Sequence, residues 1–169
     1  PGAVRQLDAA GMVRVGLGLY GSCLVPGAEA ALRPVLAWKT RIIALREVSA
    51  GAPVGYGGDR PGGWKAPRRS RIATLACGYA DGYLRAVAFA PQAHVLVRGR
   101  PAPFAGRISM DLMSVEVTAI PGARLGDEVV LIGAQRGARI RPRDLARWAG
   151  TIPYEITCAL ALRVPRRYH

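Results

Sequence analysis

The stretch EVTAIPGARLGDEVVLIGAQRGA, residues 116–138, decides the fold class of this chain. Its short apolar runs alternate with turn residues: Pro121 and Gly122 interrupt it, and Gly126 and Gly133 close a run of Val, Leu and Ile. Apolar runs of this length, bounded by Gly and Pro and rich in β-branched residues, are typical of buried strands. The stretch therefore predicts strand, turn, strand, turn.

Other segments carry the same β signature. They are rich in Val, Ile, Leu and Thr, and Gly or Pro separates most of them. In chain order, the predicted strands are residues 38–48, 71–77, 94–98, 113–118 and 128–132. Together they predict a mainly β domain over residues 38–169.

One segment predicts a helix inside this domain. In RPRDLARWAG, residues 141–150, Pro142 stands where a first helical turn tolerates it, and Gly150 can end the helix. Leu145 and Trp148 fall on one face, which we expect to be buried.

The beginning of the chain has a different pattern. MVRVGLGLYG, residues 12–21, predicts a short apolar strand ending in glycines, and a stretch containing Pro and Ala follows that could form a helix. Strand, glycine turn and helix make an α/β unit, which cannot bury its faces alone. We therefore expect residues 1–37 to be the end of an α/β domain.

Composition limits the classes of partner. The chain has 169 residues and is 50% hydrophobic, enough for one sizeable core, and no apolar run is long enough to span a membrane. Lys and Arg number 24 against 11 acidic residues, which leaves a nucleic-acid partner open, although the arginines are spread along the chain. Three Cys without C-x-x-C spacing and only two His favour reduced thiols and argue against a metal site.

Several glycine-containing motifs place polar groups where a β core does not need them. In VGYG, glycines flank Tyr56 and leave its hydroxyl exposed. GYADGYLR, residues 78–85, and GRISMD, residues 106–111, each follow a strand with polar or charged side chains. Gly16, Leu17 and Gly18 place backbone donors just past the predicted strand, where they could cradle a phosphate. VGYG and the glycines at 16 and 18 are weak signals alone, whereas GYADGYLR and GRISMD are more specific.

Taken in order, these motifs closely resemble alanine racemase of the pyridoxal-phosphate-dependent class. The matching run consists of MVRVGLGLYG, VGYG, RIATLACGYADGYLR, FAGRISMDLMSVEVT, GDEVVLIG and AGTIPYEITCALALRVPRRYH. The resemblance implies that residues 1–37 are the last strand and helix of a truncated (β/α)8 barrel. Residues 38–169 would be the C-terminal β domain of that family.

The resemblance also implies an activity, the interconversion of L- and D-alanine in the cytoplasm, which supplies D-alanine for peptidoglycan. Tyr56 matches the catalytic tyrosine that exchanges the α-proton on one face of the substrate, while a lysine serves the other face. Because a free tyrosine has a pKa of about 10, such a base needs nearby positive charge or a hydrogen bond. Met110 matches the residue whose backbone N–H holds the substrate carboxylate.

Four residues match contacts to pyridoxal 5'-phosphate. Arg14 matches the arginine that faces the pyridine nitrogen; a guanidinium can only donate, so it limits electron withdrawal into the ring. Gly16 and Leu17 match backbone donors to the cofactor phosphate, and Tyr154 matches a tyrosine whose hydroxyl reaches the same phosphate.

A further set matches the narrow entrance that admits a small amino acid: Tyr79, Arg85, Arg107, Asp111 and Ile152. In the family, the β domain of one subunit reaches the barrel mouth of the other. The resemblance therefore implies a homodimer in which Tyr56 and Met110 act in the partner's active site. The cofactor residues would act in the active site of their own subunit. Neither nucleic acid nor a membrane is an expected partner.

The chain departs from the family pattern in two places. The K-A-x-x-Y-G-H run with the cofactor lysine is absent, and neither Lys39 nor Lys65 stands in a matching position. We therefore expect this chain alone to be inactive and not to hold the cofactor covalently. The loop between Tyr56 and Tyr79 is also longer than the usual family spacing.

Other functions remain open on the sequence alone. A racemase of broader substrate range, or a decarboxylase of the same two-domain architecture, would share the fold, although the SMD motif and the Tyr56 loop argue against the decarboxylase. From a different class, an arginine-rich β module could bind nucleic acid.

Overall fold

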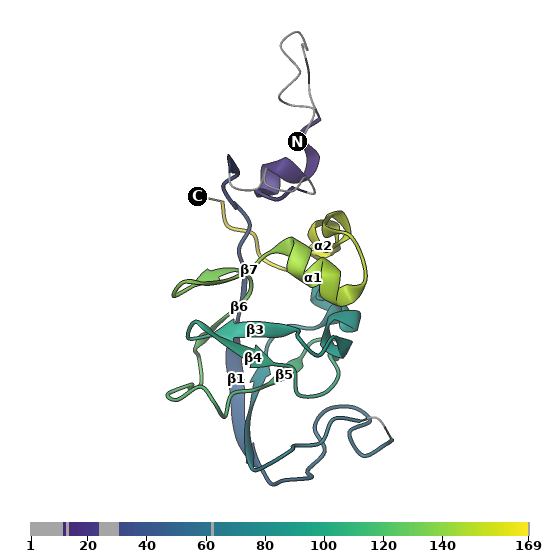
Figure 1. Cartoon of the computed structure of the whole chain (residues 1–169), viewed down its shortest axis with the longest axis vertical. Coiled ribbons are helices and arrows are strands. Elements are labelled where there is room, and N and C mark those ends of the chain that lie inside the picture. Colours follow the sequence, from purple (N-terminus) through teal and green to yellow (C-terminus); the bar gives the residue numbers. More distant parts are fainter. Residues whose placement is uncertain (1–11, 13, 24–30, 62, 169) are drawn as a thin grey trace.

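The strands pair into one seven-stranded antiparallel sheet in the order β4-β3-β6-β1-β2-β5, with β7 paired to β6 (Figure 1). This computed structural model describes residues 12, 14–23, 31–61 and 63–168. The strands are β1 (Trp38–Val48), β2 (Ser70–Leu75), β3 (His94–Val97), β4 (Arg100–Pro103), β5 (Met113–Glu116), β6 (Glu128–Gln135) and β7 (Ala138–Ile140). The prediction of a mainly β, antiparallel fold is confirmed, and each predicted strand is present with small shifts at its ends.

The sheet closes on itself. β1 is long enough to pair with β6 through Trp38–Arg41 and with β2 through Ile42–Val48, with irregular register in both pairings. At the other end of the path, Phe104 forms an antiparallel bridge with Val115, and the Ala105 N–H donates to the Ser114 carbonyl at 2.8 Å. This contact joins the β4 side to β5, so neither end of the sheet is left as an open edge.

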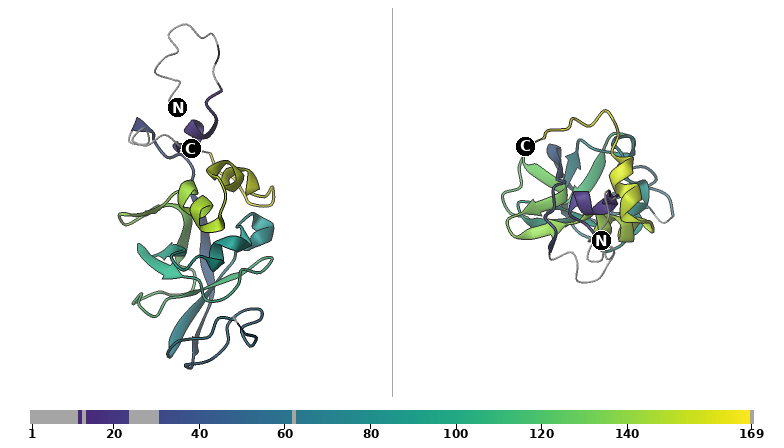
Figure 2. Two further views of the ribbon diagram at one scale, coloured as in Figure 1. Left: turned by 45° about the vertical axis from the view of Figure 1, so that its right-hand side comes forward. Right: turned by 90° about the horizontal axis from the view of Figure 1, so that it is seen from above.

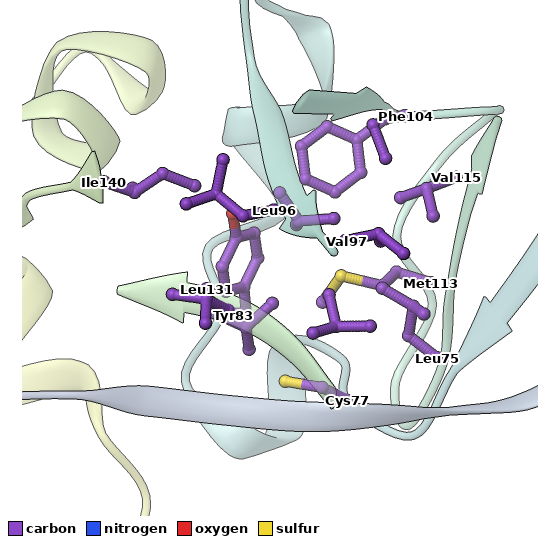
Figure 3. Close-up of a cluster of buried hydrophobic side chains, with 14 of the residues drawn as sticks. Leu75, Cys77, Tyr83, Leu96, Val97, Phe104, Met113, Val115, Leu131 and Ile140 are labelled. Carbon is purple, nitrogen blue, oxygen red and sulfur yellow. The ribbon is translucent and has the colours of Figure 1, made fainter. Parts of the chain in front are cut away.

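Apolar side chains from opposite sides of this closed sheet meet in the core (Figure 3). Val, Ile, Leu and Ala supply most of it, as the composition predicts. Tyr83 is fully buried at its centre, with its ring 5.5 Å from that of Trp38 and 6.0 Å from that of Phe104.

Two α-helices follow the last strand. The predicted helix is present as α1 (Pro142–Ala149), and Gly150 ends it in the left-handed conformation at φ 70°. The Asp144 carboxylate accepts a 2.8 Å hydrogen bond from the Arg141 N–H, which caps the first turn. A second helix, α2 (Pro153–Ala159), was not predicted. Short 3₁₀ helices η4 (Tyr79–Asp81) and η5 (Arg85–Phe89) lie between β2 and β3.

The predicted strand at residues 12–21 is wrong where the structure describes it. Gly16–Tyr20 form a 3₁₀ helix, η2, and the Gly18 N–H donates to the Val15 carbonyl at 3.3 Å. The described part of the chain places no parallel strand beside this segment, so its backbone bonds locally instead. The helix expected after it falls on residues 24–30, which lie outside the described residues.

Two segments that carry predicted site residues lie far apart. Both views that look across the long axis place η2 at one end of the molecule and the loop between β1 and β2 at the other (Figures 1 and 2). None of the described helices is long and apolar enough to cross a bilayer.

Candidate functional site

Tyr56 stands at the tip of a glycine-flanked loop between β1 and β2, with 78% of the residue exposed. Gly55 and Gly57 on either side have φ values of 74° and 73°, a backbone region that glycine adopts without strain. A Cβ on Gly55 would lie 3.5 Å from the backbone nitrogen of Arg107, and one on Gly57 would lie 3.8 Å from Nη1 of the Arg107 side chain. The loop that carries Tyr56 therefore runs directly along Arg107.

Residues 109–112, which we call the SMD turn, lie beside η4. The Ser109 N–H donates to the Leu112 carbonyl at 2.9 Å, which closes the turn. The Ala80 N–H of η4 donates to the Met110 carbonyl at 2.9 Å. At Gly78 a Cβ would lie only 2.3 Å from the Met110 oxygen, so this close approach requires glycine.

The Met110 backbone N–H remains available. No hydrogen bond from it to a described residue is formed, although the Ser109 and Leu112 peptides of the same turn are engaged. The residue is 54% exposed. The turn thus presents a fixed backbone donor to a ligand.

An open cavity of about 770 Å³ gathers most of the predicted site residues. Its lining consists of Tyr56, Tyr79, Arg85, Arg107, Ile108, Ser109, Met110, Asp111 and Leu112. Two guanidinium groups, two phenols and the free N–H of the SMD turn meet here, a set suited to a small anionic or zwitterionic ligand. Of the predicted catalytic, substrate and entrance residues, only Ile152 does not line it; this residue lies exposed just before α2.

An ion-pair cluster that the sequence motifs did not predict borders the cavity. Arg163, in the segment after α2, donates from Nε to Asp81 Oδ1 and from Nη2 to Asp111 Oδ1, both at 2.7 Å. The hydrogen bonds to these two carboxylates raise the pKa of Arg163, with Asp81 the larger influence. The motifs GYADGYLR and RVPRRYH contain Asp81 and Arg163, but no spacing rule connects them.

The predicted cofactor residues form a second group, around η2 and α2. Gly16 has φ 58°, and a Cβ on it would lie 3.5 Å from the Tyr154 hydroxyl oxygen. The N–H groups of Gly16 and Leu17 have no acceptor among the described residues. Two backbone donors and a phenol at one place fit a phosphate group, and the exposed Arg14 lies just before them.

The two groups are separate within one chain. None of the cofactor residues lines the cavity, and the loop that carries Tyr56 and η2 lie at opposite ends of the molecule (Figure 1). In the described parts of the chain, no group of three or more His, Cys, Asp or Glu side chains is placed to hold a metal ion.

Similarity to known proteins was found over almost the whole chain. A family model described as "Alanine racemase, C-terminal domain" matches residues 35–168. Alanine racemase from Halothermothrix orenii is 49% identical over 161 residues, which cover 93% of this chain and 40% of that protein.

Solved structures agree with this match. The biosynthetic alanine racemase from Pseudomonas aeruginosa superposes with a TM-score of 0.77 at 43% identity, over 90% of this chain and 41% of that one. Alanine racemase from Bartonella henselae, solved with covalently bound pyridoxal phosphate, gives a TM-score of 0.75 at 30% identity, over 90% and 40% of the two chains. The present chain thus spans about 40% of the length of the relatives it matches.

Proposed function

Because this chain belongs to the alanine racemase C-terminal domain family, we propose that it is part of a pyridoxal-phosphate-dependent racemase that interconverts L- and D-alanine. The observation that carries this proposal is the cavity that Tyr56 shares with the free Met110 N–H. The enzyme would act in the cytoplasm and supply D-alanine for peptidoglycan. We assign residues 38–169 to its β domain and residues 1–37 to the end of its barrel; the start of β1 at Trp38 supports this boundary.

Tyr56 would be the base on one face of the substrate. Pyridoxal phosphate, when bound, draws electrons from the substrate α-carbon and makes its proton acidic. The Tyr56 oxygen would then exchange that proton. The Arg107 guanidinium lies beside the loop that carries Tyr56 and lines the same cavity. Inversion needs a second base on the opposite face. This chain supplies none, since its two lysines lie in the β domain, where Lys39 pairs with Glu128 at 3.0 Å.

The SMD turn would bind the substrate. The Met110 N–H donates to the carboxylate of alanine, while Arg85 and Arg107 in the same cavity attract that carboxylate. Tyr79 and Asp111 line the same cavity and would help to restrict it to a small amino acid, with Ile152 contributed at the mouth of a complete site.

The residues around η2 would hold the cofactor. The N–H groups of Gly16 and Leu17, which have no acceptor among the described residues, would bind its phosphate together with the Tyr154 hydroxyl. Arg14 would face the pyridine nitrogen, where its guanidinium donates a hydrogen bond and keeps its own proton.

We further propose a homodimer in which Tyr56 and Met110 complete the partner's active site. The separation of the Tyr56 loop from η2 within one chain supports this arrangement (Figure 2). A single copy cannot bring its own Tyr56 to its own cofactor residues without refolding.

A chimera tests the proposal. This chain would replace the corresponding segment of the biosynthetic alanine racemase from Pseudomonas aeruginosa, to which it is 43% identical. With pyridoxal phosphate added, the chimera should racemise alanine, and the same chimera with Tyr56→Phe is the control. A folded, cofactor-loaded chimera without racemase activity would contradict the proposal. Strong, salt-dependent binding of this chain to random DNA, unaffected by pyridoxal phosphate, would favour a nucleic-acid module instead.

A further inference from the structure

We propose that Arg163 is a positioning residue for substrate binding: it pairs with Asp111 and offsets its negative charge, so that the neighbouring Met110 N–H can receive a carboxylate. The inference rests on the proposed function, because it concerns the same anion site. It assigns a role to a residue that does not line the cavity.

The geometry singles out the guanidinium of Arg163. Its Nη2 donates to Asp111 Oδ1 and its Nε to Asp81 Oδ1, both at 2.7 Å, so one planar group spans the two carboxylates. Asp81 is mostly buried, with 18% of its side chain exposed, whereas Asp111 is 59% exposed and borders the cavity. No other described cation forms an ion pair with either carboxylate.

Charge explains why this pairing matters at the SMD turn. Asp111 directly follows Met110, whose free N–H would receive a ligand that carries a negative charge of its own. An unpaired Asp111 carboxylate would repel that ligand, since like charges at such short range disfavour each other even near a protein surface. Arg163, which Asp111 shares with Asp81, offsets part of the negative charge of the two carboxylates. Arg85 and Arg107 add positive charge to the cavity.

The segment that carries Arg163 is held in place without its side chain. The Ala161 N–H donates to the Asp81 carbonyl at 3.1 Å, which ties the segment to η4. A Cβ on Gly82 would lie 1.9 Å from the Ala159 oxygen, so the two backbones are in close contact. A substitution at Arg163 should therefore change charge and leave the fold intact.

Steady-state kinetics of the chimera test the inference. Arg163→Gln should raise the KM for alanine about three- to tenfold, in keeping with the modest strength of exposed ion pairs, and change kcat less than about twofold. Arg166→Gln is the matched control, because Arg166 lies in the same segment and bonds to the Leu160 carbonyl rather than to a carboxylate of the site. It should leave both constants unchanged.

A double variant separates charge from structure. The double variant Arg163→Gln/Asp111→Asn removes the carboxylate next to Met110 but leaves Asp81 unpaired, so its KM should fall well below that of Arg163→Gln. The KM of Arg163→Lys should lie between the values of the parent and Arg163→Gln. If the double variant keeps the raised KM, or if Arg163→Gln lowers kcat instead, the residue has a structural role and the inference is wrong.

A second measurement needs no racemase activity. In the 169-residue chain, acetate should shift the Met110 amide resonance. Arg163→Gln should need higher acetate concentrations for the same shift, and the double variant should recover most of this loss. An inactive chimera would contradict the proposed function, while this titration would still decide the role of Arg163. Equal acetate affinity in the parent and Arg163→Gln would overturn it.

Discussion

A Cβ on Gly16 would lie 3.5 Å from the Tyr154 hydroxyl oxygen, so η2 and α2 meet although most of the chain separates them in sequence. This contact assembles the proposed phosphate site at one end of the molecule, while Tyr56 lies on the loop at the other end (Figure 2). Each chain carries two parts of a site that do not meet, which two copies related by a twofold axis could complete for each other.

Complementation between subunits is the first prediction. In the chimera, Tyr56→Phe and Arg14→Ala should each be nearly inactive as homodimers. A heterodimer of the two, purified with different tags, should recover about half of the parent activity, because one of its two sites has every residue intact. A heterodimer without activity would contradict the assignment of Tyr56 to the partner's site.

The buried Tyr83 hydroxyl leads to the second prediction. It has no hydrogen-bond partner among the described residues, although the ring lies in the core (Figure 3). Tyr83→Phe should therefore leave the unfolding free energy within about 1 kcal/mol of the parent or raise it. Tyr83→Ala should cost about 3–5 kcal/mol because it opens a cavity. Denaturant unfolding measures both, and a loss above about 2 kcal/mol in the Phe variant would mean that the hydroxyl has a partner.

The third prediction concerns alkaline pH. Burial, and next the Asp81 carboxylate, raise the pKa of the Cys77 thiol. Above about pH 8.5 the thiol of the unfolded chain ionises while the folded chain keeps its proton. The contribution of Cys77 to the unfolding free energy is therefore fully present below that pH. Above it the unfolding free energy falls, by at most about 1.4 kcal/mol per pH unit.

Variants of Cys77 and Cys158 check the source of this slope. Cys77→Ala should flatten the decline in unfolding free energy between about pH 8.5 and 10, whereas Cys158→Ala, at an exposed position, should keep it. An unchanged slope in Cys77→Ala would assign the decline to other groups.

The fourth prediction concerns the cofactor and this chain alone. Its two lysines lie in the β domain, and Lys39 is paired with Glu128. With pyridoxal phosphate added, the chain should show no visible absorbance band of a protein-bound Schiff base and no racemase activity. A band that survives gel filtration and disappears in Lys39→Arg or Lys65→Arg would contradict this prediction.

The sequence predicted the parts of the fold that depend on hydrophobic patterning. The five strands and α1 combine apolar runs with Gly or Pro at their ends, and these local signals agree with the final packing. β4 and β7 were missed because their hairpins turn on Arg-Gly pairs: Arg98 and Arg136 have φ values of 52° and 49°, which arginine rarely adopts. β4 also contains two prolines, which usually argue against a strand.

For the site, the sequence predicted individual residues that belong to motifs, but not the contacts between residues distant in sequence. Motif resemblance identified Tyr56 and Met110, and the structure brings them to one cavity. Arg163 was missed because its role depends on Asp81 and Asp111, which are distant in sequence and meet it only in the folded chain. The strand expected at η2 failed because a parallel strand requires neighbours to bond with, and the described residues supply none.

The most direct test of the central claim is solvent deuterium exchange of the α-proton, measured separately from L- and D-alanine with the Tyr56→Phe chimera. The substitution removes one hydroxyl from an exposed side chain, so folding and cofactor binding should survive. Loss of a positioned acid–base group costs a factor of about 10² to 10⁴. Exchange from L-alanine should therefore nearly vanish, while the lysine on the opposite face continues to exchange the α-proton of D-alanine. Met110→Ala should be mild by comparison, since its proposed contact is the backbone N–H. If Tyr56→Phe loses exchange equally from both enantiomers, or keeps exchange from L-alanine, Tyr56 is not the base on that face.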